Sequence, residues 1–545
     1  MSLPADDPGM ARGRELRTRS LYAQLLHSLL QLNGTMKDLI WLLITKHQDP
    51  VPSGQVTKLK HLMYSSTNLL QLRSSSLPPH SLGSQGNVRT HAQDSLMIPL
   101  DSMQAAFVSP ELSNRGIDIT TLCSFSFQDF LSYQADKYQK EKNSLGFINL
   151  GISENTLCSH LVTERMSQKG ITGTEDVLME NSDQRKILPL REAIAQFLTH
   201  YCKAPTELDQ KNVVVLNGCC AVFSALAMVL CDPGDAILIP TPSYGAFTLA
   251  AKLYTRIELI FVHLSSEVSE ENPVPFQLTV NKLEEALLEA RLKGKKVKGF
   301  VLINPQYPLG NVYSQESMEA YLEFAKRNKL HVIVDERNML SVFDKSIKFH
   351  SILSFRRLPD PSRTHVIWST SKEFGIPDLC FGALYTHNQD VAAAVGSLAF
   401  LHGISSITQN KLSQLLMDKE WITQVYLPTS HAQLQTAYKY AITTLRKRNI
   451  PFLYCGSGFS IWINLQKYLD PCTFNQEQCL HNRFLDHKVL LSQGKACLSP
   501  KPGWFCLVFA KERLELELGL DRFIKALNIQ QYENIKRQLE DAMIE

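Results

Sequence analysis

Residues 365–375 have the sequence HVIWSTSKEFG, an apolar run that leads into a serine-rich turn carrying Lys372. An apolar run without polar alternation is typical of a strand that is covered on both faces of an α/β sheet. A lysine among small residues can lose its proton when it is desolvated and can then form a Schiff base with a carbonyl carbon. Most lysines in such turns are simply solvated, so Lys372 alone supports a reactive site only weakly.

Six further apolar runs accompany this one, and together they predict the sheet. The seven expected strands are Asn212–Leu216, Ala236–Pro240, Ile257–His263, Val297–Asn304, His331–Asp335, His365–Thr370 and Phe381–His387. Apolar residues at helical spacing predict amphipathic helices at Asn281–Gly294 and Gln315–Lys329. Strands that alternate with helices predict an α/β fold with a mostly parallel sheet, in which ligands collect at the carboxyl ends of the strands.

Two strand ends carry residues suited to a flat, phosphorylated cofactor. Asp335 ends an apolar strand, where its carboxylate can hold a protonated pyridine nitrogen such as that of pyridoxal phosphate (PLP). Gly218, Cys219 and Cys220 lie between a strand and an apolar helix, where backbone N–H groups can bind a phosphate. Taken singly, Asp335 is more simply explained as a helix cap, and the other segment as a strand-to-helix turn.

A third strand end carries Tyr244, whose ring can stack on a flat heterocycle or can equally be a packed core residue. The four segments are much more specific together than apart. Their order is a phosphate turn, a stacking aromatic, a strand-end aspartate and the sequence Ser-x-Ser-Lys. This order resembles the fold-type I PLP enzymes of the class I and II aminotransferases.

Other segments resemble one branch of that family, the 1-aminocyclopropane-1-carboxylate synthases and their vertebrate relatives. Residues 151–155 (GISEN) are similar to the family's G-x-x-E-N motif, and residues 304–310 (NPQYPLG) to its N-P-x-N-P-L-G loop. Residues 371–377 (SKEFGIP) and 503–505 (GWF) match two further motifs. The resemblance covers roughly residues 118–535 and implies a fold-type I transferase with a smaller α+β domain, PLP as cofactor, and a homodimer with the active site at its interface.

The resemblance also implies a role for five residues. Lys372 falls on the Schiff-base lysine, Ser369 on a phosphate-binding serine and Asp335 on the partner of the pyridine nitrogen. Tyr244 falls on the stacking aromatic and Glu154 on a glutamate at the substrate side. Gly218, Cys219 and Cys220 form the phosphate turn, and no metal site is implied.

Several other family positions carry a different residue here. Cys380 stands where an arginine holds the PLP phosphate, and Cys506 stands where an arginine holds the substrate α-carboxylate. Asn338 and Tyr307 replace the tyrosine and the asparagine that bond the phenolic oxygen of the cofactor. Gln184 replaces an aromatic residue that reaches the phosphate of the neighbouring subunit.

These replacements predict weakened PLP binding and little α-amino acid chemistry. Removing one partner of a buried charge pair costs about 2–5 kcal/mol, and a cysteine replaces neither arginine charge. Arg337 and Lys186 are the candidates for a substitute cation. We expect Arg337 to point to solvent, although its place two residues after Asp335 also allows it to face the pocket.

Composition excludes several other classes of protein. A net charge of +3 over 545 residues gives no reason to expect nucleic acid or an anionic membrane as a partner. The twelve cysteines form no C-x-x-C pair, so a zinc site is not expected and the thiols are interpreted as reduced in the cytoplasm. No apolar run is long enough to cross a membrane.

The predicted domain map has four parts. Residues 1–105 form a largely disordered extension, and 106–185 form an N-terminal arm with part of the small domain. Residues 186–430 form the large PLP-binding domain, and 431–545 the rest of the small domain. Three functions stay open. The first is a family member that retains PLP on Lys372 but is inactive or very weak, and the second is an active transaminase or β-lyase with an altered substrate. The third is a non-catalytic role, either as the dimer partner of an intact paralogue or as a binding protein that docks a partner through residues 1–105.

Overall fold

The computed structural model describes residues 111–168, 188–270 and 274–544. The predicted extension 1–105 and the residues Gln184 and Lys186 lie outside this range. The strands are β1 (Ile148–Asn149), β2 (Val213–Leu216), β3 (Ala236–Thr241), β4 (Glu258–His263), β5 (Val297–Ile303), β6 (His331–Asp335), β7 (Thr364–Trp368), β8 (Gly382–Thr386), β9 (Ser460–Asn464), β10 (Val489–Leu490), β11 (Ser492–Gln493) and β12 (Trp504–Val508). The four-part domain map stays a prediction.

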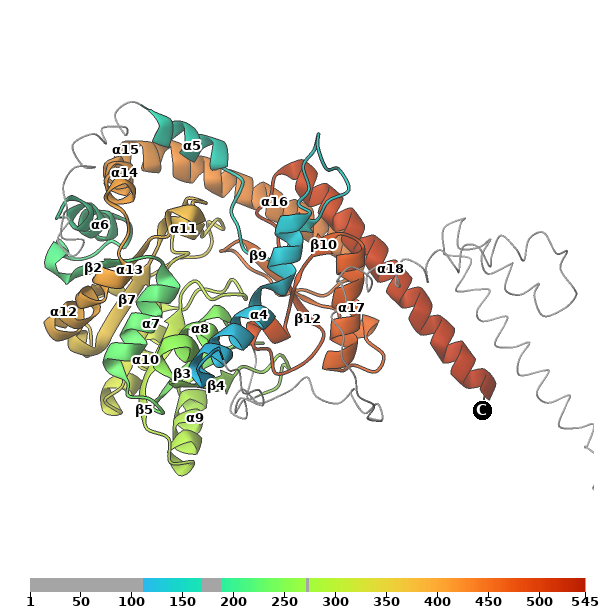
Figure 1. Cartoon of the computed structure of the whole chain (residues 1–545), viewed down its shortest axis with the longest axis horizontal. Helices are drawn as coiled ribbons and strands as arrows, with labels where there is room; N and C mark the ends of the chain where they lie inside the picture. Colours follow the sequence, from blue (N-terminus) through green and yellow to red (C-terminus); the bar gives the residue numbers. More distant parts are fainter. Residues whose placement is uncertain (1–110, 169–187, 271–273, 545) are drawn as a thin grey trace, which may run out of the picture. The chain divides into compact units, whose positions relative to one another are not determined.

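The helices connect and cover these strands (Figure 1). They are α4 (Asn114–Ala135), α5 (Ser159–Ser167), α6 (Leu188–Tyr201), α7 (Cys219–Leu230), α8 (Ala246–Ala250), α9 (Val280–Leu292), α10 (Gln315–Arg327), α11 (Thr370–Glu373), α12 (Gln389–Ser397), α13 (Ala399–His402), α14 (Ser406–Met417), α15 (Lys419–Trp421), α16 (Leu427–Lys447), α17 (Phe474–Asp486) and α18 (Arg513–Ile544). The two amphipathic helices expected from the sequence are α9 and α10.

A seven-stranded sheet forms the centre of the fold, and its strands are the seven that the sequence predicts. Their order is β2-β8-β7-β6-β5-β3-β4. Strands β7, β6, β5, β3 and β4 pair in parallel, whereas β8 is antiparallel to both of its neighbours. The expectation of a mostly parallel sheet is therefore confirmed.

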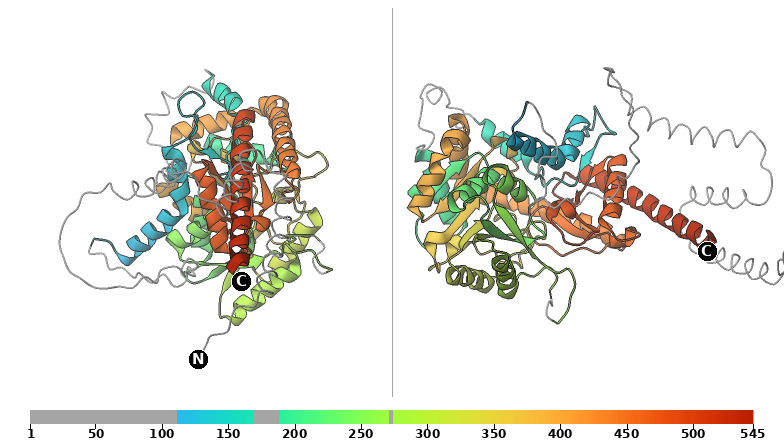
Figure 2. Two further views of the ribbon diagram at one scale, coloured as in Figure 1. Left: turned by 90° about the vertical axis from the view of Figure 1, so that its right-hand side faces the viewer. Right: turned by 60° about the horizontal axis from the view of Figure 1, so that its bottom comes forward.

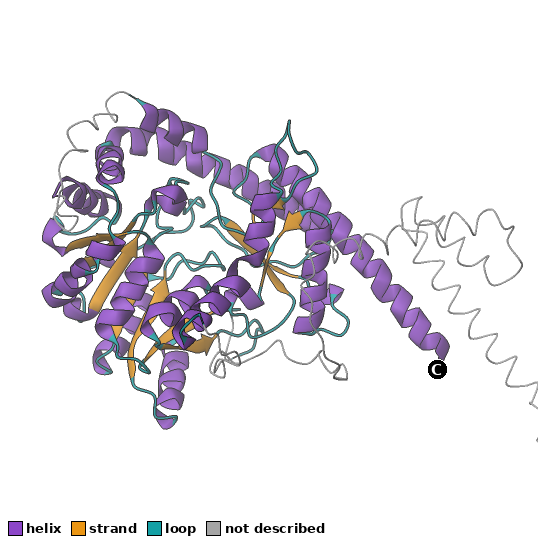
Figure 3. Cartoon of the chain, in the orientation of Figure 1, coloured by secondary structure: helices purple, strands orange, loops and turns teal. Residues whose placement is uncertain are grey.

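Alternate residues of the central strands lie in two different hydrophobic cores, which explains why the strands are almost uninterruptedly apolar. Val301, Ile333 and Ile367 lie in the core that contains α7 and α12. Phe300 and Val332 lie in the core that contains α9 and α10. Helices thus cover both faces of the sheet, as Figure 3 shows, and only the strand ends are left to bind a ligand.

A second, three-stranded antiparallel sheet has the order β11-β12-β9 and carries the C-terminal motifs. Its central strand β12 includes Cys506, which pairs with Ser492 on one side and Trp462 on the other. Helix α18, the long red helix of Figure 2, packs along α17. The ring centroids of Phe484 in α17 and Phe523 in α18 lie 5.4 Å apart. The short strands β1 and β10 pair in parallel and join the segment before Gly151 to the C-terminal part of the chain.

Strand β8 holds the predicted phosphate turn in place through a close backbone contact. A Cβ atom added at Gly382 would lie 2.6 Å from the Gly218 carbonyl oxygen and 2.7 Å from the Cys219 amide nitrogen. Only glycine allows the two backbones to approach this closely.

We therefore expect Gly382→Ala to lower the free energy of unfolding by about 1–3 kcal/mol, because the added methyl group forces the backbone apart. Gly396→Ala is the matched control, since a Cβ there meets nothing within 4 Å. In helix α12 that change is expected to raise stability by about 0.5–1 kcal/mol. Urea unfolding of both variants measures the difference, and equal effects would contradict the proposed contact.

Candidate functional site

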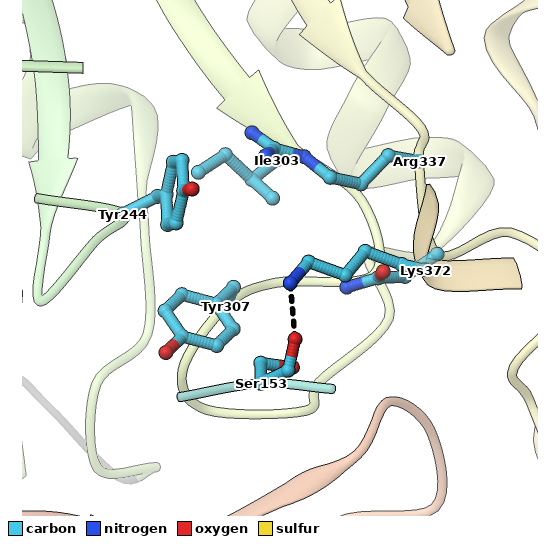
Figure 4. Close-up of a pocket in the computed structure, with 7 residues that line it drawn as sticks. Ser153, Tyr244, Ile303, Tyr307, Arg337 and Lys372 are labelled. Carbon is cyan, nitrogen blue, oxygen red and sulfur yellow. Dashed lines mark hydrogen bonds between the residues drawn. The ribbon is translucent and has the colours of Figure 1, made fainter. Parts of the chain in front are cut away.

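A small pocket lies at the carboxyl ends of the parallel strands, where the sequence predicts a ligand site. It is lined by Ser153, Tyr244, Ile303, Tyr307, Arg337, Asn338 and Lys372 (Figure 4). Tyr244 follows β3, Ile303 ends β5, Arg337 follows β6 and Lys372 lies in α11 just after β7. The topology thus brings together residues that are up to 219 positions apart in the chain.

Lys372 extends into this pocket, and its amine donates a hydrogen bond to the Ser153 carbonyl oxygen. Burial and, second to it, the charge of Arg337 lower the pKa of the Lys372 amine to about 8, while the charge of Glu154 opposes the shift. About a tenth of the amine is therefore unprotonated at pH 7, far more than for a lysine with the ordinary pKa. This is the state in which a lysine is a nucleophile.

Arg337 and Asp335 form a buried ion pair beside Lys372. The Arg337 Nε lies 3.0 Å and 2.8 Å from the two Asp335 carboxylate oxygens, and Nη2 also donates to Oδ2. Only 7% of Arg337 and 1% of Asp335 is exposed. Burial opposes the charge on Arg337, but the charge and hydrogen bonds of Asp335, together with smaller contributions from Cys219 and Tyr244, hold the pKa of the guanidinium well above its ordinary value.

The guanidinium of Arg337 also lies on the ring of Tyr244, with its carbon 4.4 Å from the ring centroid, and 5.3 Å from that of Phe247. Figure 4 shows Arg337 and Lys372 entering the pocket from the same side, opposite Tyr244. The expectation that Arg337 points to solvent is therefore wrong. The Arg337 backbone amide donates to the Asp335 side chain at 3.2 Å, which turns the chain so that the arginine folds back into the pocket.

The predicted phosphate turn begins helix α7. Gly218 adopts a φ of 121°, and the helix has no side-chain cap, so its first N–H groups are available to an anion. Cys219 is buried and Cys220 half-buried, and burial raises the pKa of both thiols while Arg337 partly offsets the shift. Both side chains are neutral and add no charge for a phosphate.

Ser369 and Cys380, at the other two positions that the family resemblance assigns to the phosphate, offer few contacts to a phosphate. The Ser369 hydroxyl donates to the Phe381 carbonyl at 2.7 Å and accepts from the Ser371 amide at 3.1 Å, so it serves as the cap of α11. Cys380 is exposed and follows the 3-10 turn Pro377–Leu379. A thiol on an exposed turn thus stands where the family resemblance places an arginine.

Cys506 and Tyr307 stand where the family contacts the substrate carboxylate and the phenolic oxygen of the cofactor. In this chain the two side chains contact each other and carry no charge. The Tyr307 hydroxyl lies 3.8 Å from the Cys506 sulfur, and the Tyr307 ring meets Tyr244 edge-on at 5.7 Å. Burial raises the pKa of both Tyr307 and Cys506, so both stay uncharged. The Asn338 Oδ1 is buried without a hydrogen-bond partner and lines the same pocket.

Glu154 is not one of the residues that line the pocket, but its carboxylate interacts electrostatically with the Lys372 amine. Its carboxylate accepts from Lys511 at 3.2 Å and from the Asn149 side chain at 3.3 Å. Lys511 is only 3% exposed and is a buried cation that the sequence analysis missed. Its position five residues after Cys506, in a segment that otherwise matches the family, is the signal that could have found it.

In this conformation the residues present do not fit PLP. The two groups that would hold the cofactor ring, Asp335 and Tyr244, are both engaged by Arg337. The guanidinium fills the space between these two groups, so a ring can reach both of them only if Arg337 moves.

Comparison with known sequences gives the same family as the motifs. The family described as aminotransferase class I and II matches residues 146–523. The chain is 53% identical to the human protein named "Probable inactive 1-aminocyclopropane-1-carboxylate synthase-like protein 2", with 98% of each chain covered. It is 28% identical to 1-aminocyclopropane-1-carboxylate synthase 5 of Arabidopsis thaliana, with 73% of this chain and 86% of that protein covered.

Solved structures show the same fold. The crystal structure of aspartate aminotransferase from Thermotoga maritima matches with a TM-score of 0.59 at 22% identity, covering 78% of this chain and all of that one. The aromatic aminotransferase of Pyrococcus horikoshii matches with a TM-score of 0.60 at 19% identity, covering 76% of this chain and 99% of that one. The predicted fold-type I architecture is confirmed. The chain belongs to the class I and II aminotransferase family and, within it, to the 1-aminocyclopropane-1-carboxylate synthase-like proteins.

Proposed function

We propose that this chain binds PLP only weakly and is catalytically inactive, or very weak, as a synthase or aminotransferase. The observation that carries the proposal is the contact between Tyr307 and Cys506. A substrate α-carboxylate needs a cation with fixed geometry, usually a bidentate arginine. Here a neutral thiol and a neutral hydroxyl lie 3.8 Å apart at that position.

The nearby cations do not replace the missing arginine. Lys511 is ion-paired with Glu154 at 3.2 Å, and Arg337 with Asp335. An incoming carboxylate would have to break one of these buried pairs and leave a carboxylate of the chain unpaired, which is costly. The human relative with 53% identity is itself named a probable inactive protein, which supports the same conclusion.

Lys372 supports a second candidate function. This function requires Arg337 to leave Asp335 and Tyr244 so that PLP can enter. When PLP is bound, its ring withdraws electrons from the substrate. Lys372, with its lowered pKa, is placed to hold the cofactor and to accept a proton at Nζ. A surviving reaction would use an amine without an α-carboxylate, because no free cation among the described pocket residues faces such a group. Transamination and β-elimination are the reaction types that the family resemblance suggests.

A homodimer is a further proposal, as is a mixed dimer with an intact paralogue. Phe400 and Leu401, neighbours on the short helix α13, are 83% and 74% exposed. Adjacent large apolar side chains with this exposure are typical of a surface that another chain covers.

A cytoplasmic location is also proposed, on the sequence alone. No helix in the described parts of the chain is both long and apolar enough to span a bilayer.

The proposed inactivity predicts the result of a turnover assay. With saturating PLP and a panel of α-amino acids, we expect no more product from the wild-type chain than from Lys372→Ala, because no cation positions the carboxylate. The same panel should include amines without a carboxylate. Turnover of an α-amino acid that disappears in Lys372→Ala would overturn the proposed inactivity. Turnover of an amine alone would establish the second candidate.

A further prediction concerns the Lys372 amine. Its reductive alkylation by a small aldehyde should rise with pH and level off above a midpoint near pH 8, because only the unprotonated amine reacts. In the urea-unfolded chain the midpoint should return to about 10.4, the ordinary value for lysine. Mass spectrometry of the peptide that contains Lys372 measures both profiles. Coinciding midpoints would show that the pocket does not shift this pKa.

A further inference from the structure

The Arg337 side chain makes the two contacts that a cofactor ring would require. A protonated pyridine ring is flat, carries positive charge, stacks on an aromatic side chain and pairs with a carboxylate. The guanidinium is also flat and charged, and it stacks on aromatic faces and forms two-pronged bonds with carboxylates. In this chain it lies 4.4 Å from the Tyr244 ring centroid and 2.8–3.0 Å from the oxygens of Asp335.

These contacts are mutually exclusive with a bound ring. Tyr244 offers one face to the pocket, and the guanidinium covers it. Asp335 is 1% exposed, and both of its oxygens accept from Arg337. A ring can therefore make the same two contacts only after Arg337 has moved out.

We propose that Arg337 is an internal occupant of the cofactor-ring site and is the residue that sets the affinity of this chain for PLP. The inference deepens the proposed weak cofactor binding and rests on it. Cysteine at positions 380 and 506 only removes contacts from the cofactor and the substrate. Arg337 instead competes for the site itself, so its removal should restore a binding capacity.

Arg337→Ala and Arg337→Gln test the proposal. The glutamine amide can still donate a hydrogen bond to Asp335, so this variant guards against loss of folding in the alanine variant. Arg357→Ala is the matched control, since Arg357 is exposed and lies outside the pocket lining. The readouts are the visible absorbance of bound PLP and its covalent trapping on Lys372 by borohydride.

We expect the half-saturating PLP concentration to fall about tenfold or more in both Arg337 variants and to stay at the wild-type value in Arg357→Ala. A site open one-tenth of the time shows an affinity reduced about tenfold, and removing the occupant removes that factor. If both Arg337 variants fold and bind PLP no more tightly than the wild type, the proposal is overturned.

Methylguanidinium provides a second, independent arm. In Arg337→Ala it should raise the thermal midpoint and compete with PLP, because it can re-enter the vacated site between Asp335 and Tyr244. Methylammonium, which is charged but not flat, should compete much less. No competition, or equal competition by both cations, would mean that the site does not select a flat cation and would overturn the proposal. Turnover by the wild-type chain would overturn the proposed inactivity but leave this inference standing.

Discussion

The buried ion pair between Asp335 and Arg337 is the constraint on which the rest of the site depends. A carboxylate at the end of a central strand, 1% exposed, is very unfavourable unless a cation with good geometry lies opposite it. The fold places Asp335 there through the register of β6 between β5 and β7. The chain therefore needs a cation at this point, whether that cation belongs to a ligand or to the protein.

Once Arg337 meets that need, its charge affects the neighbouring groups. It helps burial to lower the pKa of Lys372, and it partly offsets the effect of burial on the Cys219 and Cys220 thiols. The rest of the pocket is neutral, with Tyr307 facing the sulfur of Cys506. The frame of an aminotransferase thus remains, with a reactive amine at its centre, while the charges that would orient a cofactor and a substrate are missing or already paired.

The sequence predicted the fold and the candidate residues better than the contacts that their side chains make in the site. The seven strands could be found because strands covered on both faces are almost continuously apolar, and the candidate residues could be found because they follow strand ends in a set order. The direction of Arg337 could not, since it depends on a turn at Asp335 and on a tyrosine that is distant in the sequence. Lys511 was missed because its partner Glu154 lies 357 residues away in the chain. The antiparallel direction of β8 and its close contact with Gly218 could not be predicted either, because neither produces a periodic pattern in the sequence.

A cation supplied by residue 337 has a consequence for how the protein is maintained in the cell. Enzymes that borrow a charged group from a cofactor gain stability from it in proportion to the logarithm of its free concentration, and they lose stability when the cofactor is scarce. A cation built into the polypeptide is present at a fixed ratio from the moment of synthesis. The Asp335 carboxylate of this chain is thereby paired without a cofactor, so this part of its stability does not depend on the concentration of free cofactor.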